Sequence, residues 1–204
     1  MKTDAPIKCS CGKVEGVARG LSRSSTNHVV CSCKGCQSYA HYLGRTDDML
    51  DAEGGSNIVQ MDPSKFEITR GMENVVCMRV TNDGPLRWYT SCCNTPLGNT
   101  FPRGGLPFIG FLPICLGIKG TSEELVALVG KSRGHVNRPE KTPLFDRIGN
   151  VFMIIGLFCK IMFWRVRGGP AFKPFFDAET MRPMVKPIKI SDEERAELEA
   201  KAGF

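Results

Sequence analysis

The stretch Cys31-Ser32-Cys33-Lys34-Gly35-Cys36 contains three of the ten cysteines of this 204-residue chain. Cysteines separated by one or two residues in a tight loop can turn their sulfur atoms toward a single ion, and a glycine lets the backbone fold around it. Zn²⁺ takes four ligands in a tetrahedron, so three thiolates leave one position for another ligand. Three protein ligands with one open position are typical of a catalytic zinc. We therefore predict a functional zinc site at Cys31, Cys33 and Cys36.

Two further clusters lie on either side of this stretch. They are Cys9-Ser10-Cys11-Gly12 and the adjacent pair Cys92-Cys93. A lone Cys-x-Cys is as typical of buried or redox-active thiols as of a metal site. Three clusters in one short chain favour metal, and the spacing lacks the runs of iron–sulfur ferredoxins. The remaining cysteines lie in apolar or strand-like settings and are expected to be core residues rather than ligands: Cys77, Cys115 and Cys159.

Composition is that of an ordinary globular protein, with 42% hydrophobic and 24% charged residues. The net charge of +6 favours anionic partners but is too small for a nucleic-acid-binding tail, so no nucleic-acid partner is expected. The polar start of the chain lacks the apolar core of a secretory signal. We therefore expect a cytoplasmic location, where disulfides are rare and clustered cysteines indicate metal binding.

Short β-strands are predicted over the first hundred residues. The clearest signal is a hairpin, in which Val75–Thr81 and Arg87–Thr90 flank the turn Asn82-Asp83-Gly84. Weaker strand patterns cover residues 13–19, 27–30, 57–62 and 66–70. Such closely spaced strands predict a mainly β, compact antiparallel domain over residues 5–120.

Residues 121–204 are predicted to form a C-terminal helical extension. Its most apolar part, about 144–166, is expected to be a helix, and Lys160 interrupts an uncharged run that is too short for the roughly 20 residues of a membrane span. We expect this helix to pack on the β core, and a peripheral membrane or partner-binding helix is the alternative. Ser191 and Glu194 form a capping box that predicts a short terminal helix at about 191–202.

The cysteine motifs resemble those of the glutathione-dependent formaldehyde-activating enzyme family, which includes the centromere protein V domain. The resemblance covers roughly residues 5–115. It rests on Cys9-x-Cys11-Gly12, then Cys31-x-Cys33-x-x-Cys36, then Cys93-Asn94-Thr95-Pro96-Leu97. It implies a β-tent fold with two zinc ions, one structural and held by the first and third clusters, the other functional and held by Cys31, Cys33 and Cys36.

The third motif departs from the family pattern C-x-x-C-G-T and marks a divergent branch. Thr90 stands at the first cysteine position, Asn94 replaces the glycine, and Cys92 is additional. The structural site is therefore expected to use Cys9, Cys11 and Cys93, with Cys92 as a substitute fourth ligand. Adjacent cysteines reach one ion only with an unusual local backbone.

By resemblance, the expected function is that of a zinc-dependent carbon–sulfur lyase similar to S-hydroxymethylglutathione synthase. Its partner would be a small thiol such as a glutathione adduct. The alternative is a non-catalytic zinc module that binds another protein, and a fourth protein ligand at the three-cysteine site would favour it. Lys34 and Arg103 are candidates for substrate steering and His41 for proton transfer, but surface charge or packing explains these three better. Tyr39 and Tyr42 are candidates for a pocket, and aromatic packing beside the metal loop explains them equally well.

Overall fold

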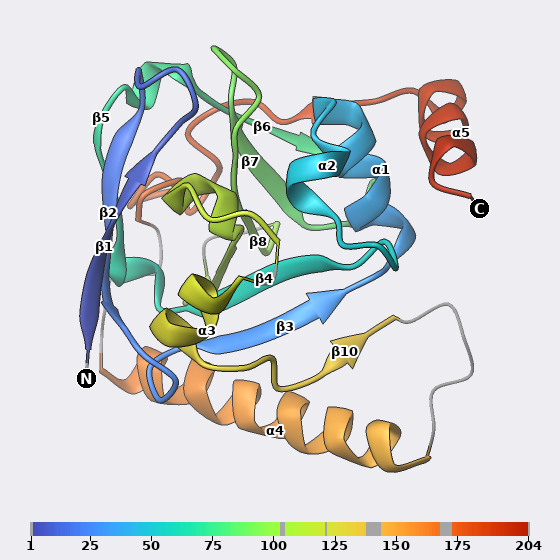
Figure 1. Ribbon diagram of the computed structural model, residues 1–204. Helices are drawn as coiled ribbons and strands as arrows, with labels where there is room; N and C mark the ends of the chain where they lie inside the picture. Colours follow the sequence, from blue (N-terminus) through green and yellow to red (C-terminus); the bar gives the residue numbers. More distant parts are fainter. Residues whose placement is uncertain (1, 103–104, 121, 138–143, 168–172, 204) are drawn as a thin grey trace.

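Two β-sheets face each other across the main hydrophobic core, as the computed structural model shows (Figure 1). The structure describes residues 2–102, 105–120, 122–137, 144–167 and 173–203, without the side chains of residues 144–150. In spatial order, the larger sheet comprises β10 (His135–Val136), β3 (Asn27–Cys31), β4 (Ser56–Met61), β9 (Ile109–Phe111), β8 (Pro96–Thr100), β7 (Leu86–Thr90), β6 (Val75–Arg79) and β11 (Ile188–Lys189). The smaller sheet comprises β1 (Thr3–Lys8), β2 (Glu15–Leu21) and β5 (Phe66–Arg70).

The strand pairs are antiparallel except at the two edges of the larger sheet. There β10 and β11, both from the C-terminal part of the chain, pair in parallel with β3 and β6. The predicted hairpin is confirmed, with Cys77 opposite Trp88 and Met78 opposite Arg87. Both Cys77 and Met78 are fully buried, although they alternate along β6. The reason is that one face of the sheet packs on the main core and the other on helix α1 (Lys34–Leu43).

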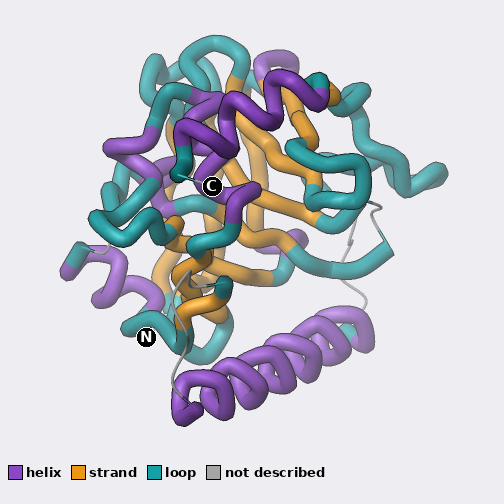
Figure 2. Tube along the Cα trace, turned by 90° about the vertical axis from the view of Figure 1, so that its right-hand side faces the viewer, coloured by secondary structure: helices purple, strands orange, loops and turns teal. Residues whose placement is uncertain are grey.

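Helices and strands both make up a large share of the described residues, so the fold is mixed α/β rather than mainly β. The other helices are α2 (Thr46–Met49), α3 (Glu123–Val129), α4 (Leu144–Val166) and α5 (Asp192–Lys201), with 3-10 turns at Pro63–Lys65, Met72–Asn74 and Pro113–Leu116 (Figure 2). The expectation of strands alone in the first hundred residues was wrong at α1. This helix buries Tyr39, Ala40 and Leu43 against the larger sheet. A helix this short is stabilised mainly by packing of its apolar face, so its local sequence signal is weak.

Serine side chains cap the helices at the two ends of the C-terminal part, and the cap at Ser191 is the one predicted. Ser122 accepts a hydrogen bond from the Leu125 backbone N–H, and Ser191 accepts one from Glu194. Between these helices, Phe175 lies in the main core and stacks on Trp88 with ring centroids 4.3 Å apart. Residues beyond 120 therefore complete both the larger sheet and its core.

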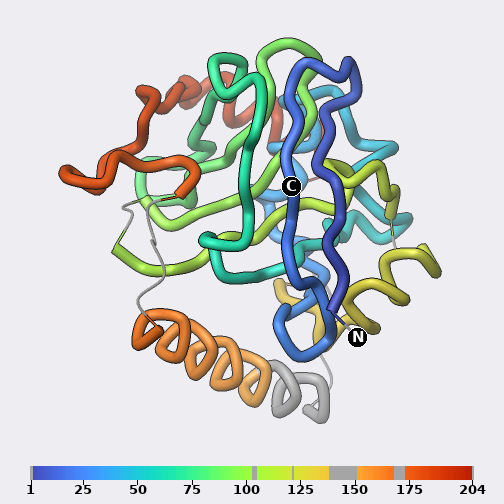
Figure 3. Tube along the Cα trace, turned by 90° about the vertical axis from the view of Figure 1, so that its left-hand side faces the viewer, coloured from blue at the N-terminus to red at the C-terminus, as the bar shows by residue number. Residues whose placement is uncertain are grey.

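Helix α4 lies along one side of the molecule, next to β10 (Figures 1 and 3). It packs inward through Ile161 and Trp164, but several large apolar side chains point to solvent. The expectation that this helix packs on the core is therefore correct for one face only. Within the described residues, none of the helices has the length and hydropathy needed to span a bilayer.

Candidate metal centres

Four cysteines from two loops meet at the first centre. Cys9 and Cys11 lie in the turn between β1 and β2, and Cys92 and Cys93 lie in the turn between β7 and β8. The Sγ–Sγ separations are 3.6 Å for Cys9–Cys11, 3.9 Å for Cys9–Cys92, 3.3 Å for Cys11–Cys92 and 3.8 Å for Cys92–Cys93. The two loops are more than 80 residues apart in the chain and are brought together by the two sheets.

These separations fit a tetrahedral zinc ion. Zinc–sulfur bonds of about 2.3 Å in a tetrahedron place the sulfur atoms about 3.8 Å apart. Four thiolates also form a closed donor set that suits a structural zinc. The Val14 backbone N–H points at Cys9 Sγ at 3.2 Å, the kind of hydrogen bond that stabilises a ligating thiolate. The centre can therefore hold a metal ion, and the ligand role of each cysteine stays a prediction.

The turn between β7 and β8 explains how two adjacent cysteines reach one centre. Asn94 adopts a left-handed conformation with φ of 52°, and its N–H donates to the Thr90 carbonyl at 2.8 Å. Asparagine is among the few non-glycine residues that tolerate this region. Asn94 thus keeps the backbone geometry that the glycine of the resembled motif would allow.

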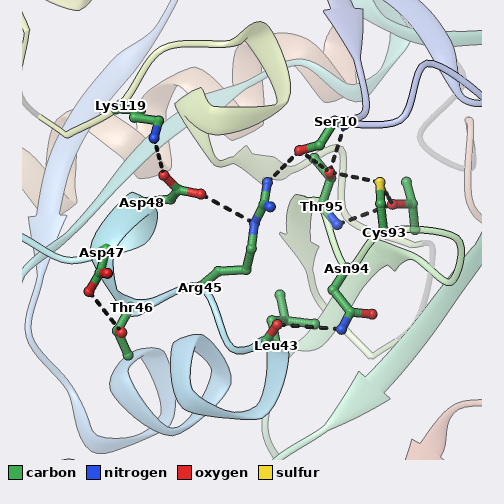
Figure 4. A network of polar contacts seen from close by, with 11 residues as sticks. Ser10, Leu43, Arg45, Thr46, Asp47, Asp48, Cys93, Asn94, Thr95 and Lys119 are labelled. Atoms are coloured by element: carbon green, nitrogen blue, oxygen red, sulfur yellow. Dashed lines mark hydrogen bonds and ion pairs between the residues drawn. The ribbon is translucent and has the colours of Figure 1, made fainter.

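A polar network supports this turn from outside (Figure 4). Thr95 Oγ1 lies 3.2 Å from Cys93 Sγ and also accepts the Ser10 backbone N–H at 3.0 Å. Arg45 reaches the Ser10 hydroxyl and pairs with Asp48, which Lys119 contacts at 2.6 Å. The network joins both cysteine loops to α2, so it orients the ligands without contributing to the donor set.

Cys31, Cys33 and Cys36 form the second centre, and their sulfur atoms lie within 4.8 Å of one another. Cys31 ends β3, and Cys33 is the N-cap of α1, where its Sγ accepts the Cys36 N–H at 3.4 Å. The positive end of a helix stabilises a thiolate at this position. Among the described residues, no fourth cysteine, histidine or carboxylate belongs to the group.

Arg87 is a functional candidate that the sequence did not indicate. It comes from β7, is only 3% exposed, and places Nη1 and Nη2 3.8 Å and 3.9 Å from Cys36 Sγ. Asn99 accepts a hydrogen bond from Nη1 at 3.3 Å, and the guanidinium lies 5.1 Å from the centre of the Tyr39 ring. A Cβ at Gly35 would lie 3.0 Å from Nη2, so this glycine makes room for the cation.

Asn137 also approaches this centre, with Nδ2 3.7 Å from Cys31 Sγ. In the sequence, both Arg87 and Asn137 read as ordinary polar residues, one on a strand and one in a basic loop. Nothing in their spacing links them to the cysteines. Arg87 meets Cys36 because α1 packs over β7, and Asn137 meets Cys31 because β10 pairs with β3.

The cysteines of the second centre differ in acidity in the metal-free protein. Hydrogen bonds from Cys31 and Cys36, helped by the charge of Arg87, hold the pKa of Cys33 far below its usual value. The pKa of Cys31 is raised by its hydrogen bond to Cys33, and that of Cys36 by its hydrogen bonds to Cys31 and Cys33. Burial opposes the charge on Arg87, but the thiolates outweigh it and raise the pKa of Arg87. The acidic Cys33 thiol and the Arg87 cation therefore favour each other's charged forms.

At the first centre, Cys93 is the acidic thiol. Burial opposes its ionisation, but hydrogen bonds from Thr90 and Thr95 outweigh burial and lower its pKa to about 5. Burial, together with hydrogen bonding to Cys11, raises the pKa of Cys92 to about 12.

In zinc-free protein, we expect Cys93 to react with iodoacetamide far faster than Cys92 at neutral pH, because only the thiolate is nucleophilic. The rate should fall as the pH drops through about 5. Since this pKa is lowered on folding, the stability contributed by the Cys93 thiolate is present above the unfolded-state pKa and lost toward pH 5. Fragmentation of the peptide that contains both cysteines in a mass spectrometer would show whether Cys92 or Cys93 carries the label. Buried Cys115 is the unreactive control, and equal labelling of Cys92 and Cys93 would contradict the prediction.

The other residues singled out in the sequence lie elsewhere. His41 is in the last turn of α1 and is not part of the three-cysteine group, and Lys34 is exposed in its first turn. Tyr39 is buried and donates to the Trp88 carbonyl, and Tyr42 contacts the Tyr89 hydroxyl, so both pack rather than line a pocket. Arg103 lies outside the described residues.

The three unclustered cysteines divide into two kinds. Cys77 and Cys115 are fully buried in the main core, as predicted. Cys159 is exposed on α4, so the prediction was wrong there, because no described element packs on this side of the helix. All ten cysteines are free thiols in the structure.

Two sheets of mostly antiparallel strands, with two cysteine clusters that can each hold a metal ion, define the class of this protein. The chain belongs to the family of unknown function DUF6151, whose model matches residues 1–134. The match includes every cysteine of the two clusters and ends just before β10. No curated protein matches the chain.

A solved structure is also similar, the crystal structure of a Rhodobacter sphaeroides protein from the Northeast Structural Genomics effort. It is 17% identical, with a TM-score of 0.39, and the match covers 62% of this chain and 97% of that chain.

Proposed function

We propose that this chain is a two-zinc protein in which a four-cysteine centre is structural and the three-cysteine centre binds the sulfur of a small thiol. The reaction would be addition of that thiol to an aldehyde, or the reverse, as in adducts of glutathione. One observation carries the proposal: Cys31, Cys33 and Cys36 converge with no fourth protein ligand among the described residues. The resemblance to the formaldehyde-activating enzymes and the β-tent fold it implies support the same chemistry.

Cys31, Cys33 and Cys36 would hold the zinc ion, whose Lewis acidity lowers the pKa of a bound thiol. The addition forms one carbon–sulfur bond, and the thiol proton moves to the aldehyde oxygen. The protein supplies charge balance, because Arg87 places a buried cation beside Cys36 and offsets the negative charge of the thiolates. Asn137 contributes a hydrogen bond to Cys31, which orients that sulfur.

We expect Cys33→Ser to abolish glutathione binding, since the change removes one of three ligands of the open centre. Binding would be measured by isothermal titration on protein purified without chelator, with zinc counted by mass spectrometry. The matched control is Cys159→Ser, because Cys159 is an exposed thiol outside both clusters. Glutathione binding by Cys33→Ser at the wild-type affinity would disprove the proposed site.

The non-catalytic alternative has its own supporting observation. Cys31 and Cys36 are only 7% and 5% exposed, and Met153 of α4 and Val136 of β10 pack against their cluster. A centre so enclosed suits a structural zinc that shapes a binding surface. Full zinc content without glutathione binding, and without turnover of glutathione and formaldehyde followed by proton NMR, would favour this function.

A further inference from the structure

Helix α4 exposes an apolar face that none of the other described segments covers. Phe152 and Phe158 are 70% and 62% exposed, and Val151, Ile154, Ile155 and Phe163 are each more than half exposed. At about 100° per residue, these side chains fall on one half of the helix. The opposite half faces the protein through Lys160, Ile161 and Trp164, and Lys160 donates to the Thr26 carbonyl. Apolar surface gathered in this way on one helix marks an interaction site.

Positive charge surrounds the C-terminal end of this face. Arg165 and Arg167 are exposed, and Arg167 lies over the Phe163 ring at 4.4 Å. Arg167 and Phe163 also line a hollow with Lys2 and Lys65, which contains Asp4 and Asp62 as its only acidic lining residues among those described. In sequence, α4 itself has one acid, Asp146, against three basic residues.

We propose that α4 is an interfacial helix, whose exposed apolar face docks on a membrane surface that contains anionic lipids. Aromatic and aliphatic side chains on one face, with arginine at its border, suit the boundary between headgroups and acyl chains. Anionic headgroups attract a basic border, and the net charge of +6 adds to this attraction. A second copy of the chain fits this face less well, because a dimer would bring the positively charged borders of two α4 helices together.

Docking would also orient the three-cysteine centre. Met153, on the inner side of α4, packs against the cluster that contains Cys31 and Cys36. The outer face of the same helix would then lie in the membrane surface, with the centre directly behind it. Membrane docking by α4 does not depend on whether the three-cysteine centre is catalytic. A negative result for membrane binding would therefore leave the proposed thiol chemistry untouched, and the reverse also holds.

The test is co-sedimentation of the full-length, zinc-loaded protein with phosphatidylcholine vesicles, with and without phosphatidylserine. We expect binding to the anionic vesicles at low salt, weakened by high salt and by Arg165→Gln with Arg167→Gln. Phe152→Gln with Phe158→Gln should lower the partition coefficient by roughly tenfold or more, because two large anchors are lost. Met184→Gln is the matched control, since Met184 is a 57% exposed apolar residue outside α4.

Unchanged zinc content and melting temperature would show that each variant folds. Absence of binding at low salt, or wild-type binding by the double phenylalanine variant, would overturn the proposal. A dimer in lipid-free solution that the same two substitutions dissociate would also overturn it, because a second copy would then occupy the face.

Discussion

Replacing Cys92 with serine is expected to remove one of two zinc ions and to lower the free energy of unfolding by at least about 3 kcal/mol, since binding to a structural site is coupled to folding. For a chain of this size, that loss corresponds to a fall in melting temperature of roughly 6–12 °C. Cys92 Sγ lies 3.3 Å from Cys11 and 3.9 Å from Cys9, so it joins the two loops. Mass spectrometry of intact protein and thermal unfolding would measure both effects.

Two further variants make the test specific. Cys159→Ser removes an exposed thiol outside the clusters and should leave zinc content and stability unchanged. Thr90→Cys, added to Cys92→Ser, restores the C-x-x-C spacing of the resembled motif. Thr90 Oγ1 lies 3.4 Å from Cys93 Sγ, so a thiol at this position would point into the centre and should recover the second zinc ion. Two zinc ions in Cys92→Ser alone would show that Cys92 is not a ligand.

Replacing Arg87 with methionine is expected to weaken zinc binding at the three-cysteine centre by roughly 10- to 100-fold, the usual effect of losing a group that supports metal ligands. Removing one partner of a buried charge pair also costs about 3–5 kcal/mol of stability. The effect is large here because Arg87 is almost fully buried, and both of its terminal nitrogens face Cys36. Competition with a chromophoric chelator would measure the affinity of each centre.

The lysine variant separates charge from shape. Arg87→Lys keeps the cation but loses the planar fork that contacts Cys36 and Asn99 together, so an intermediate affinity is expected. Arg79→Met serves as the control, because Arg79 lies on the neighbouring strand and bonds the Asn82 carbonyl, away from both centres. Wild-type zinc affinity in Arg87→Met would show that the cation does not balance the thiolates.

Local signals in the sequence were sufficient where one short segment contains all the information. Turn and cap residues act on the backbone within a few residues of themselves. The hairpin around Asn82-Asp83-Gly84 and the cap at Ser191 were therefore predictable from the local sequence. The spacing of Cys31, Cys33 and Cys36 likewise predicts convergence, because three thiols within one loop and one helical turn cannot be far apart. The grouping of the first and third clusters needed the family resemblance, since more than 80 residues separate them.

By itself, then, the sequence determined the cysteine-rich character of the protein, its hairpin and its capped helices. Tertiary structure alone decided which groups surround those cysteines. Arg87 reaches the second centre because α1, which contains Cys36, packs over β7, and Asn137 reaches it because β10 pairs with β3. It also decided which apolar residues are covered: Cys77 is buried and Cys159 is exposed, although both stand in apolar surroundings. Hydrophobicity sets the tendency of a side chain to leave water, but burial requires a neighbouring element, and only the fold supplies one.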